Sequence, residues 1–156
     1  MRNDWPTIVA SLAAALILTL APLPREIGVY APQWLLLVVL FWIIERPERV
    51  GLVLAWSMGL LLDIGTHALL GSNALLFTLA AALTLALQRL LKPTSIMQQG
   101  LYICGLTLVY LMISLWMRGG LQGTITEWQY LMRALSNLAA WPLLVLAVAW
   151  LHRRLG

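Results

Sequence analysis

The chain has 156 residues, of which 62% are hydrophobic and only 10% are charged. Soluble domains carry about 25% charged residues, so this composition excludes an ordinary soluble protein and indicates one that folds in a lipid bilayer. The net charge is +4, but no basic run with interleaved aromatic residues is present, which argues against nucleic acid as a partner.

Six apolar segments follow one another, separated by charged residues, prolines or glycines. They cover about residues 5–23, 30–44, 50–64, 74–91, 96–117 and 128–151. The stretches between them are too short to build a separate core, so we predict a single transmembrane domain spanning residues 1–156. No small-residue cleavage site follows the first segment, which we interpret as a spanning helix rather than a signal peptide.

The second and third segments are shorter than the ~20 residues that a helix needs to cross the hydrocarbon core. The charged turn between them, residues 45–49, requires water, which argues against a re-entrant pair. We therefore predict an all-α fold of about six transmembrane helices, with five or partial spans as the alternative. The short pair either thins the bilayer locally or is sheltered by its neighbours.

The basic residues predict the orientation. If all six segments cross, seven of the ten Lys and Arg residues share one side with both termini, and Arg25, Arg118 and Arg133 lie on the other. Because cytoplasmic loops carry the excess of basic residues, we predict that both termini are cytoplasmic.

Small residues recur at intervals of four in the third segment. Gly51, Ala55, Gly59 and Asp63 lie along one ridge of a helix, which lets another backbone approach closely. Similar spacings occur in the first segment (Ser11, Ala15, Thr19) and the fourth (Ala74, Thr78, Ala82, Ala86). The ridge serves either internal packing or the binding of a partner's membrane helix.

Asp63 is the only carboxylate within an apolar segment. A carboxylate there is costly unless it is hydrogen-bonded or near water. Three interpretations stay open: it bonds backbone amides of the following Gly65–Gly71 turn, it lies exposed at the interface, or it contacts a partner or ligand. His67 is four residues further on, where a polar pair with Asp63 is possible if the helix continues.

The inventory of reactive side chains argues against an enzyme. An intramembrane aspartyl protease needs two carboxylates at membrane depth, and only Asp63 qualifies. Ser57 and Cys104 have no base suggested by spacing, because the two histidines are His67 and His152. No catalytic, metal or cofactor site is expected.

Transport has weak support in the last segment. Asn137 and the Trp141–Pro142 pair are candidates for a polar site and a broken helix, with Arg133 nearer the outer face. Such residues are more often packing and kink features.

The order of motifs in the second to fourth segments is informative. The chain has Pro32-Gln33-Trp34-Leu35 and Trp42, then Pro47-Glu48-Arg49-Val50, Met58-Gly59-Leu60-Leu61-Leu62-Asp63 and Leu70-Gly71-Ser72-Asn73-Ala74-Leu75. This combination resembles the rod shape-determining MreD family. The match covers about residues 32–91, and its positions are Pro32, Trp34, Pro47, Arg49, Gly59, Asp63 and Gly71.

The resemblance implies a non-enzymatic inner-membrane scaffold of the cell-elongation and peptidoglycan-synthesis complex. It implies direct binding to MreC through membrane helices, and indirect links to MreB filaments, RodA and the elongation transpeptidase. It also implies a fold similar to the S-components of energy-coupling-factor transporters. Many relatives have a tyrosine where this chain has Ala80-Ala81-Ala82, so a partner contact through an aromatic side chain is not expected there.

Two functions from different classes follow. The first is the scaffold, with Gly51, Ala55, Gly59, Asp63 and Gly71 as predicted partner-binding residues. The alternative is a small-molecule-binding membrane protein of the S-component type. A pocket lined with polar groups and opening outward would favour the alternative, and the sequence offers few such groups within its helices.

Overall fold

The computed structural model describes residues 4–22, 24–28, 30–67, 69–91, 95–117 and 127–155. Within these ranges the chain forms α-helices and no strands, which confirms the predicted all-α fold. The helices are α1 (Trp5–Leu20), α2 (Arg25–Gly28), α3 (Trp34–Glu45), α4 (Leu52–Thr66), α5 (Ser72–Leu91), α6 (Ile96–Met117) and α7 (Glu127–Leu155). Each long helix lies on one predicted apolar segment, with ends that differ by up to four residues, whereas the short α2 was not predicted.

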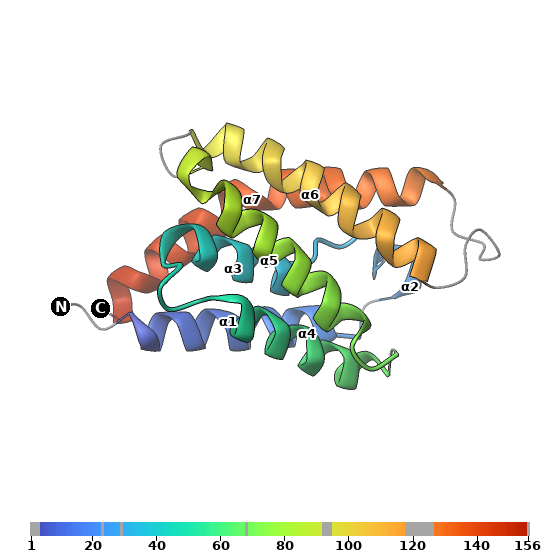
Figure 1. Ribbon diagram of the computed structural model, residues 1–156, viewed down its shortest axis with the longest axis horizontal. Helices are drawn as coiled ribbons and strands as arrows, with labels where there is room; N and C mark the ends of the chain where they lie inside the picture. The colour runs from blue at the N-terminus through green and yellow to red at the C-terminus, as the bar shows by residue number, and fades with distance from the viewer. Residues whose placement is uncertain are drawn as a thin grey trace.

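The six long helices run back and forth between two ends of a bundle (Figure 1). One end, at the left of Figure 1, holds the start of α1, the turn between α3 and α4, and the end of α7, and is called the near end. There Asp4 Oδ2 lies 3.1 Å from Arg46 Nε, and Asp4 Oδ1 lies 3.8 Å from His152 Nε2. The far end holds the last turns of α1, α4 and α6 and the first turns of α3, α5 and α7.

Helix α3 is the centre of the bundle. Nine of its twelve residues are buried, and it packs against α1, α5 and α7. Trp42, near its end, donates a hydrogen bond from Nε1 to Ser11 Oγ at 2.8 Å. Twelve residues give only about 18 Å of helix. Because neighbouring helices surround α3, it need not match the thickness of the bilayer by itself.

Large apolar side chains cover the outside of the bundle. Val53 on α4 and Met97 and Trp116 on α6 are about four-fifths exposed. So many exposed apolar side chains are costly in water and favourable in lipid. Two stretches, Ile96–Trp116 and Met132–Arg154, are long and apolar enough to cross a bilayer, and α1, α3, α4 and the described part of α5 are shorter apolar helices.

Candidate functional site

Asp63 is fully buried and binds the start of α5. Its two carboxylate oxygens accept hydrogen bonds from the backbone N–H groups of Gly71 (2.9 Å), Asn73 (3.0 Å) and Ala74 (3.2 Å). The Ser72 hydroxyl (3.1 Å) and the Asn73 side-chain amide (2.9 Å) also donate to it. These backbone donors have no partners within their own helix, so a carboxylate there satisfies them and opposes the positive end of the helix dipole.

This arrangement decides between the interpretations of Asp63. Of its backbone donors, only Gly71 belongs to the predicted Gly65–Gly71 turn; the others lie just beyond it. Exposure at the interface was wrong, because none of the side chain is accessible. His67 is exposed and forms the left-handed C-terminal cap of α4 (φ 51°). Asp63 forms its hydrogen bonds with residues 71–74 and does not pair with His67. The turn depends on Gly71, whose φ of +93° suits glycine.

The Gly51–Asp63 ridge meets the start of α5 at Gly59 and Asp63. Ala55 and Gly59 are buried, and a Cβ added to Gly59 would lie 2.5 Å from Ala74 Cα. The backbones of α4 and α5 therefore touch at this point, which is what small residues allow. Gly51 is the N-cap of α4, and a Cβ added to it would meet no atom within 4 Å.

The geometry thus favours internal packing for Ala55, Gly59 and Asp63. All three residues are buried within the chain, so a partner helix does not reach them in this arrangement. Partner binding by Gly51 and Gly71, both partly exposed, stays a prediction.

A pocket of about 410 Å³ opens at the far end of the bundle. It is enclosed by the far-end turns of all six long helices and by Gly28 of α2. Its polar lining consists of Thr19, Gln33, Thr66, Asn73, Tyr110, Ser114 and Arg133, and its apolar lining includes Leu18, Trp34, Leu36, Leu62, Phe77 and Leu111. The sequence offers few polar groups within any one helix, but the fold gathers those near the far ends of the helices into one place.

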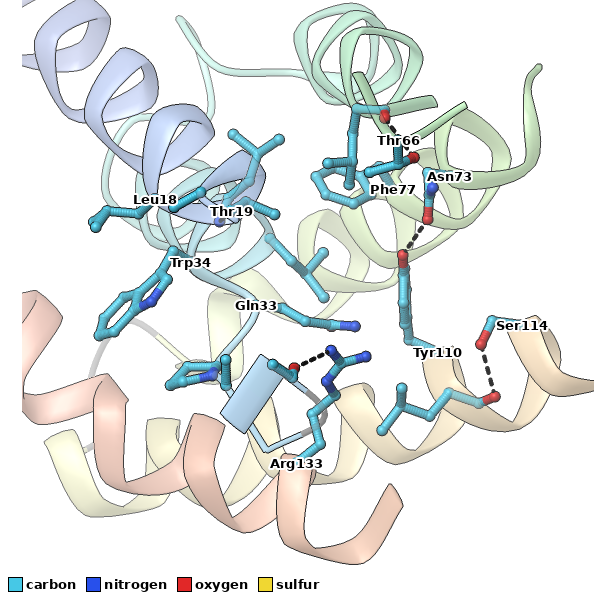
Figure 2. A pocket seen from close by; sticks show the side chains of 18 residues that line it. Leu18, Thr19, Gln33, Trp34, Thr66, Asn73, Phe77, Tyr110, Ser114 and Arg133 are labelled. Atoms are coloured by element: carbon cyan, nitrogen blue, oxygen red, sulfur yellow. Dashed lines mark hydrogen bonds between the residues drawn. The ribbon is translucent and has the colours of Figure 1, made fainter. Parts of the chain in front are cut away.

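Most hydroxyl groups of the pocket are held by the protein itself. Tyr110 donates to Asn73 Oδ1 at 2.6 Å, which links the wall of the pocket to the Asp63 cluster (Figure 2). Thr66 and Ser114 donate to carbonyl oxygens of their own helices. Arg133 enters from α7, and its Nη2 donates to the Gly28 carbonyl at 3.0 Å.

Asn137, one turn after Arg133 on α7, connects three elements. Its Oδ1 accepts the backbone N–H of Gln33 at 2.8 Å, and its Nδ2 donates to Thr107 Oγ1 of α6 at 3.0 Å. The residue is fully buried and holds these elements together, which favours a packing role over a polar transport site. Trp141, also fully buried, and Pro142, exposed, lie within the continuous helix α7.

Replacing Asn137 with alanine is expected to destabilise the protein by about 1 to 3 kcal/mol, because the Gln33 N–H and the Thr107 hydroxyl each lose a buried partner. The control is Ser136→Ala, whose hydroxyl donates only to the Met132 carbonyl of its own helix. SDS-induced unfolding followed by Trp fluorescence measures both. Equal effects of the two changes would contradict the role given to Asn137.

An apolar groove of about 260 Å³ lies between α1 and α7, with α3 as its floor. Its walls contain small residues, which lets a further helix approach closely. The lining is Ser11, Ala14, Ala15, Leu18, Trp34, Val38, Leu143, Leu144, Ala147, Val148 and Leu151. Leu18 and Trp34 line both this groove and the far-end pocket, so the two hollows adjoin.

Comparison with known proteins gives the family. A family model described as rod shape-determining protein MreD matches residues 2–149. The chain belongs to the MreD family. A rod shape-determining protein MreD of Haemophilus influenzae is 24% identical over 151 residues, which is 97% of this chain and 93% of that protein. No solved structure matches the chain.

Membership in the MreD family confirms the predicted resemblance. It assigns the chain to rod shape determination, in keeping with bacterial cell elongation and peptidoglycan synthesis, and makes it a membrane protein. It is a family of shape-determining proteins rather than one known for catalysis.

The family-matching positions have structural roles at both ends of this MreD-family chain. Arg49 Nη1 lies 3.6 Å from Asp4 Oδ2 at the near end, where Pro47 forms part of the turn. At the far end the Pro32 carbonyl accepts the backbone N–H of Trp34 at 3.1 Å, just before α3 begins. Ala80 and Ala81 are buried, so the alanines at the departure from the family pattern pack inside the bundle.

Sequence reasoning missed three of the residues that matter. Asp4 precedes the first segment and gave no periodic signal, yet it is 3% exposed and lies beside Arg46 and Arg49 of the turn after α3 and His152 of the last turn of α7. Gln33 was noted only as part of a motif. Tyr110 lies in an apolar segment that also contains Tyr102, Thr107 and Ser114, so nothing in the sequence singled it out.

Proposed function

We propose that this chain is a non-enzymatic, multi-pass scaffold of the bacterial inner membrane that binds the membrane helix of MreC. Through MreC it is linked to MreB filaments, RodA and the elongation transpeptidase. Membership in the MreD family supports the role in elongation. The observation that carries the contact with MreC is the lipid-facing groove between α1 and α7.

Six spans with both termini in the cytoplasm are part of this proposal. The six long helices join the near end to the far end in alternating directions, which supports six crossings. Arg46, Arg49, Arg153 and Arg154 lie toward the near end, and Arg133 lies toward the far end. This segregation supports a cytoplasmic near end. Arg2, Lys92 and Arg118 fall outside the described residues, as do the side chains of Arg25 and Arg89.

The groove has the properties that a membrane helix requires. Ala14 and Ala147, on its two walls, are exposed, so a helix can come close to both backbones. Its lining is almost wholly apolar, as suits contact made within lipid. Gly59, by contrast, packs on Ala74 inside the chain. If Gly59→Leu reduced the amount of MreC recovered in a pull-down, the loss would therefore report a disturbed fold rather than a lost interface.

Site-directed photocrosslinking in intact cells tests the proposal. A photoreactive residue is placed at Ala14 or Ala147 in the groove, and at Val53 or Met112 as exposed controls on α4 and α6. We expect crosslinks to MreC from the groove positions, several-fold stronger than from the controls. Equal crosslinking from all four positions, or stronger crosslinking from Val53 or Met112, would remove the groove from the interface.

One observation favours the second candidate, a small-molecule-binding membrane protein of the S-component type. The far-end pocket is lined with polar groups and, in the proposed topology, opens toward the outside. The resemblance to the S-component fold stays a prediction, since no solved structure matches. Stabilisation of the purified chain by a vitamin would support this candidate, and its absence across the vitamins that S-components carry would count against it.

A further inference from the structure

The far-end pocket has the size and chemistry of a ligand site. Its volume of about 410 Å³ lies within the ~300–1,000 Å³ usual for small-molecule pockets. Polar and apolar side chains share its lining, in contrast to the apolar groove beside it. Both features indicate a ligand with one polar and one apolar part.

The charge of the lining selects the polar part. Among the described residues that line the pocket, Arg133 is the only charged one. The nearby Asp63 carboxylate is enclosed by the start of α5 and does not line the cavity. A guanidinium presents planar N–H donors that match the oxygens of a phosphate or a carboxylate.

Gln33 supplies a second donor. Its Oε1 atom is buried without a hydrogen-bond partner among the described residues, its Nε2 atom is the donor available to a ligand, and Figure 2 shows Gln33 and Arg133 extending toward the middle of the pocket. The hydroxyls of Thr19, Thr66 and Ser114 donate to backbone carbonyls of their own helices. Their hydrogens are therefore not directed at a ligand's oxygens.

The apolar part of the ligand has an apolar surface to lie against. Leu18 and Trp34 line both the pocket and the groove, and Leu18 is half exposed. We propose that the pocket binds the oxyanion head, phosphate or carboxylate, of an amphiphile whose apolar part lies against Leu18 and Trp34. A membrane helix seated in the groove would contact the same two residues from the other side. The proposal does not depend on the scaffold function.

The test uses the purified full chain in a neutral detergent, without MreC, and follows thermal unfolding. The probes are decyl phosphate, decanoate, inorganic phosphate and decanol. We expect saturable stabilisation by decyl phosphate or decanoate, weaker binding of inorganic phosphate, and none by decanol. Inorganic phosphate binding as tightly as decyl phosphate would keep the oxyanion site and assign it to a free anion, while equal effects of decanol and decyl phosphate would overturn the proposal.

Two variants localise the binding. Arg133→Gln is expected to weaken decyl phosphate binding about tenfold, because a charge-assisted hydrogen bond is lost. Arg153→Gln removes an exposed arginine of the last turn of α7 and is expected to bind like the unchanged chain. Gln33→Leu removes a side chain whose Oε1 atom has no hydrogen-bond partner among the described residues, so it keeps the fold and is expected to weaken binding as well. Unchanged affinity in both Gln33→Leu and a folded Arg133→Gln would overturn the proposal.

Discussion

Replacing Asp63 with alanine is expected to destabilise the protein by about 3 to 5 kcal/mol, because several buried donors lose their acceptor at once and each unsatisfied group costs about 1 to 3 kcal/mol. The change leaves the backbone N–H groups of Gly71, Asn73 and Ala74 without their acceptor at the start of α5. Lipid offers no water to replace it. The stability of Asp63→Asn is expected to fall between that of the unchanged chain and that of Asp63→Ala, because an amide has only one oxygen acceptor.

SDS-induced unfolding of the purified chain in mixed micelles measures this loss, with the tryptophans as the fluorescent reporter. The control is Glu48→Ala, which removes an exposed carboxylate from the turn between α3 and α4 and is expected to change stability by less than about 0.5 kcal/mol. A stability of Asp63→Ala within that same margin would show that the carboxylate does not hold the start of α5.

Replacing Gly59 with alanine is expected to cost about 2 to 3 kcal/mol, the upper range for overpacking. The new Cβ would lie 2.5 Å from Ala74 Cα and 2.7 Å from both Ala74 N and the Asn73 carbonyl oxygen. All three are backbone atoms that no side-chain rotation can move, so α4 and α5 must separate. In most exposed helix positions the same change is favourable, because alanine is the better helix former.

Gly105→Ala is the matched control, since it makes the same change within α6 where a Cβ meets no atom within 4 Å. It is expected to leave stability unchanged or raise it by up to about 1 kcal/mol. The same unfolding assay compares the two glycines, and a Gly59→Ala protein as stable as Gly105→Ala would refute close contact between α4 and α5.

The two effects are also expected to be coupled. Asp63 lies one turn after Gly59, so pushing α4 away from α5 also draws the carboxylate away from its donors. Combining Gly59→Ala with Asp63→Ala is therefore expected to cost less than the sum of the single changes, as is usual for residues that share partners.

Local sequence was enough to predict the long helices and the face of α4 at which another backbone comes close. Apolar runs bounded by charge, proline and glycine predicted the six long helices, because helix formation in lipid depends on local composition. The spacing of Ala55, Gly59 and Asp63 predicted a close-packed ridge, because residues four apart share a helix face. These properties need no knowledge of distant parts of the chain.

Which apolar faces turn inward could be learned only from the folded arrangement of the helices. Leu37 is buried and Leu79 is exposed, yet in a bilayer both positions favour leucine, because lipid is as apolar as a protein core. Hydropathy therefore did not reveal that the start of α5 meets the ridge. Nor did it reveal the far-end pocket, whose Thr19, Gln33 and Arg133 are far apart in the sequence and meet only when six helix ends come together.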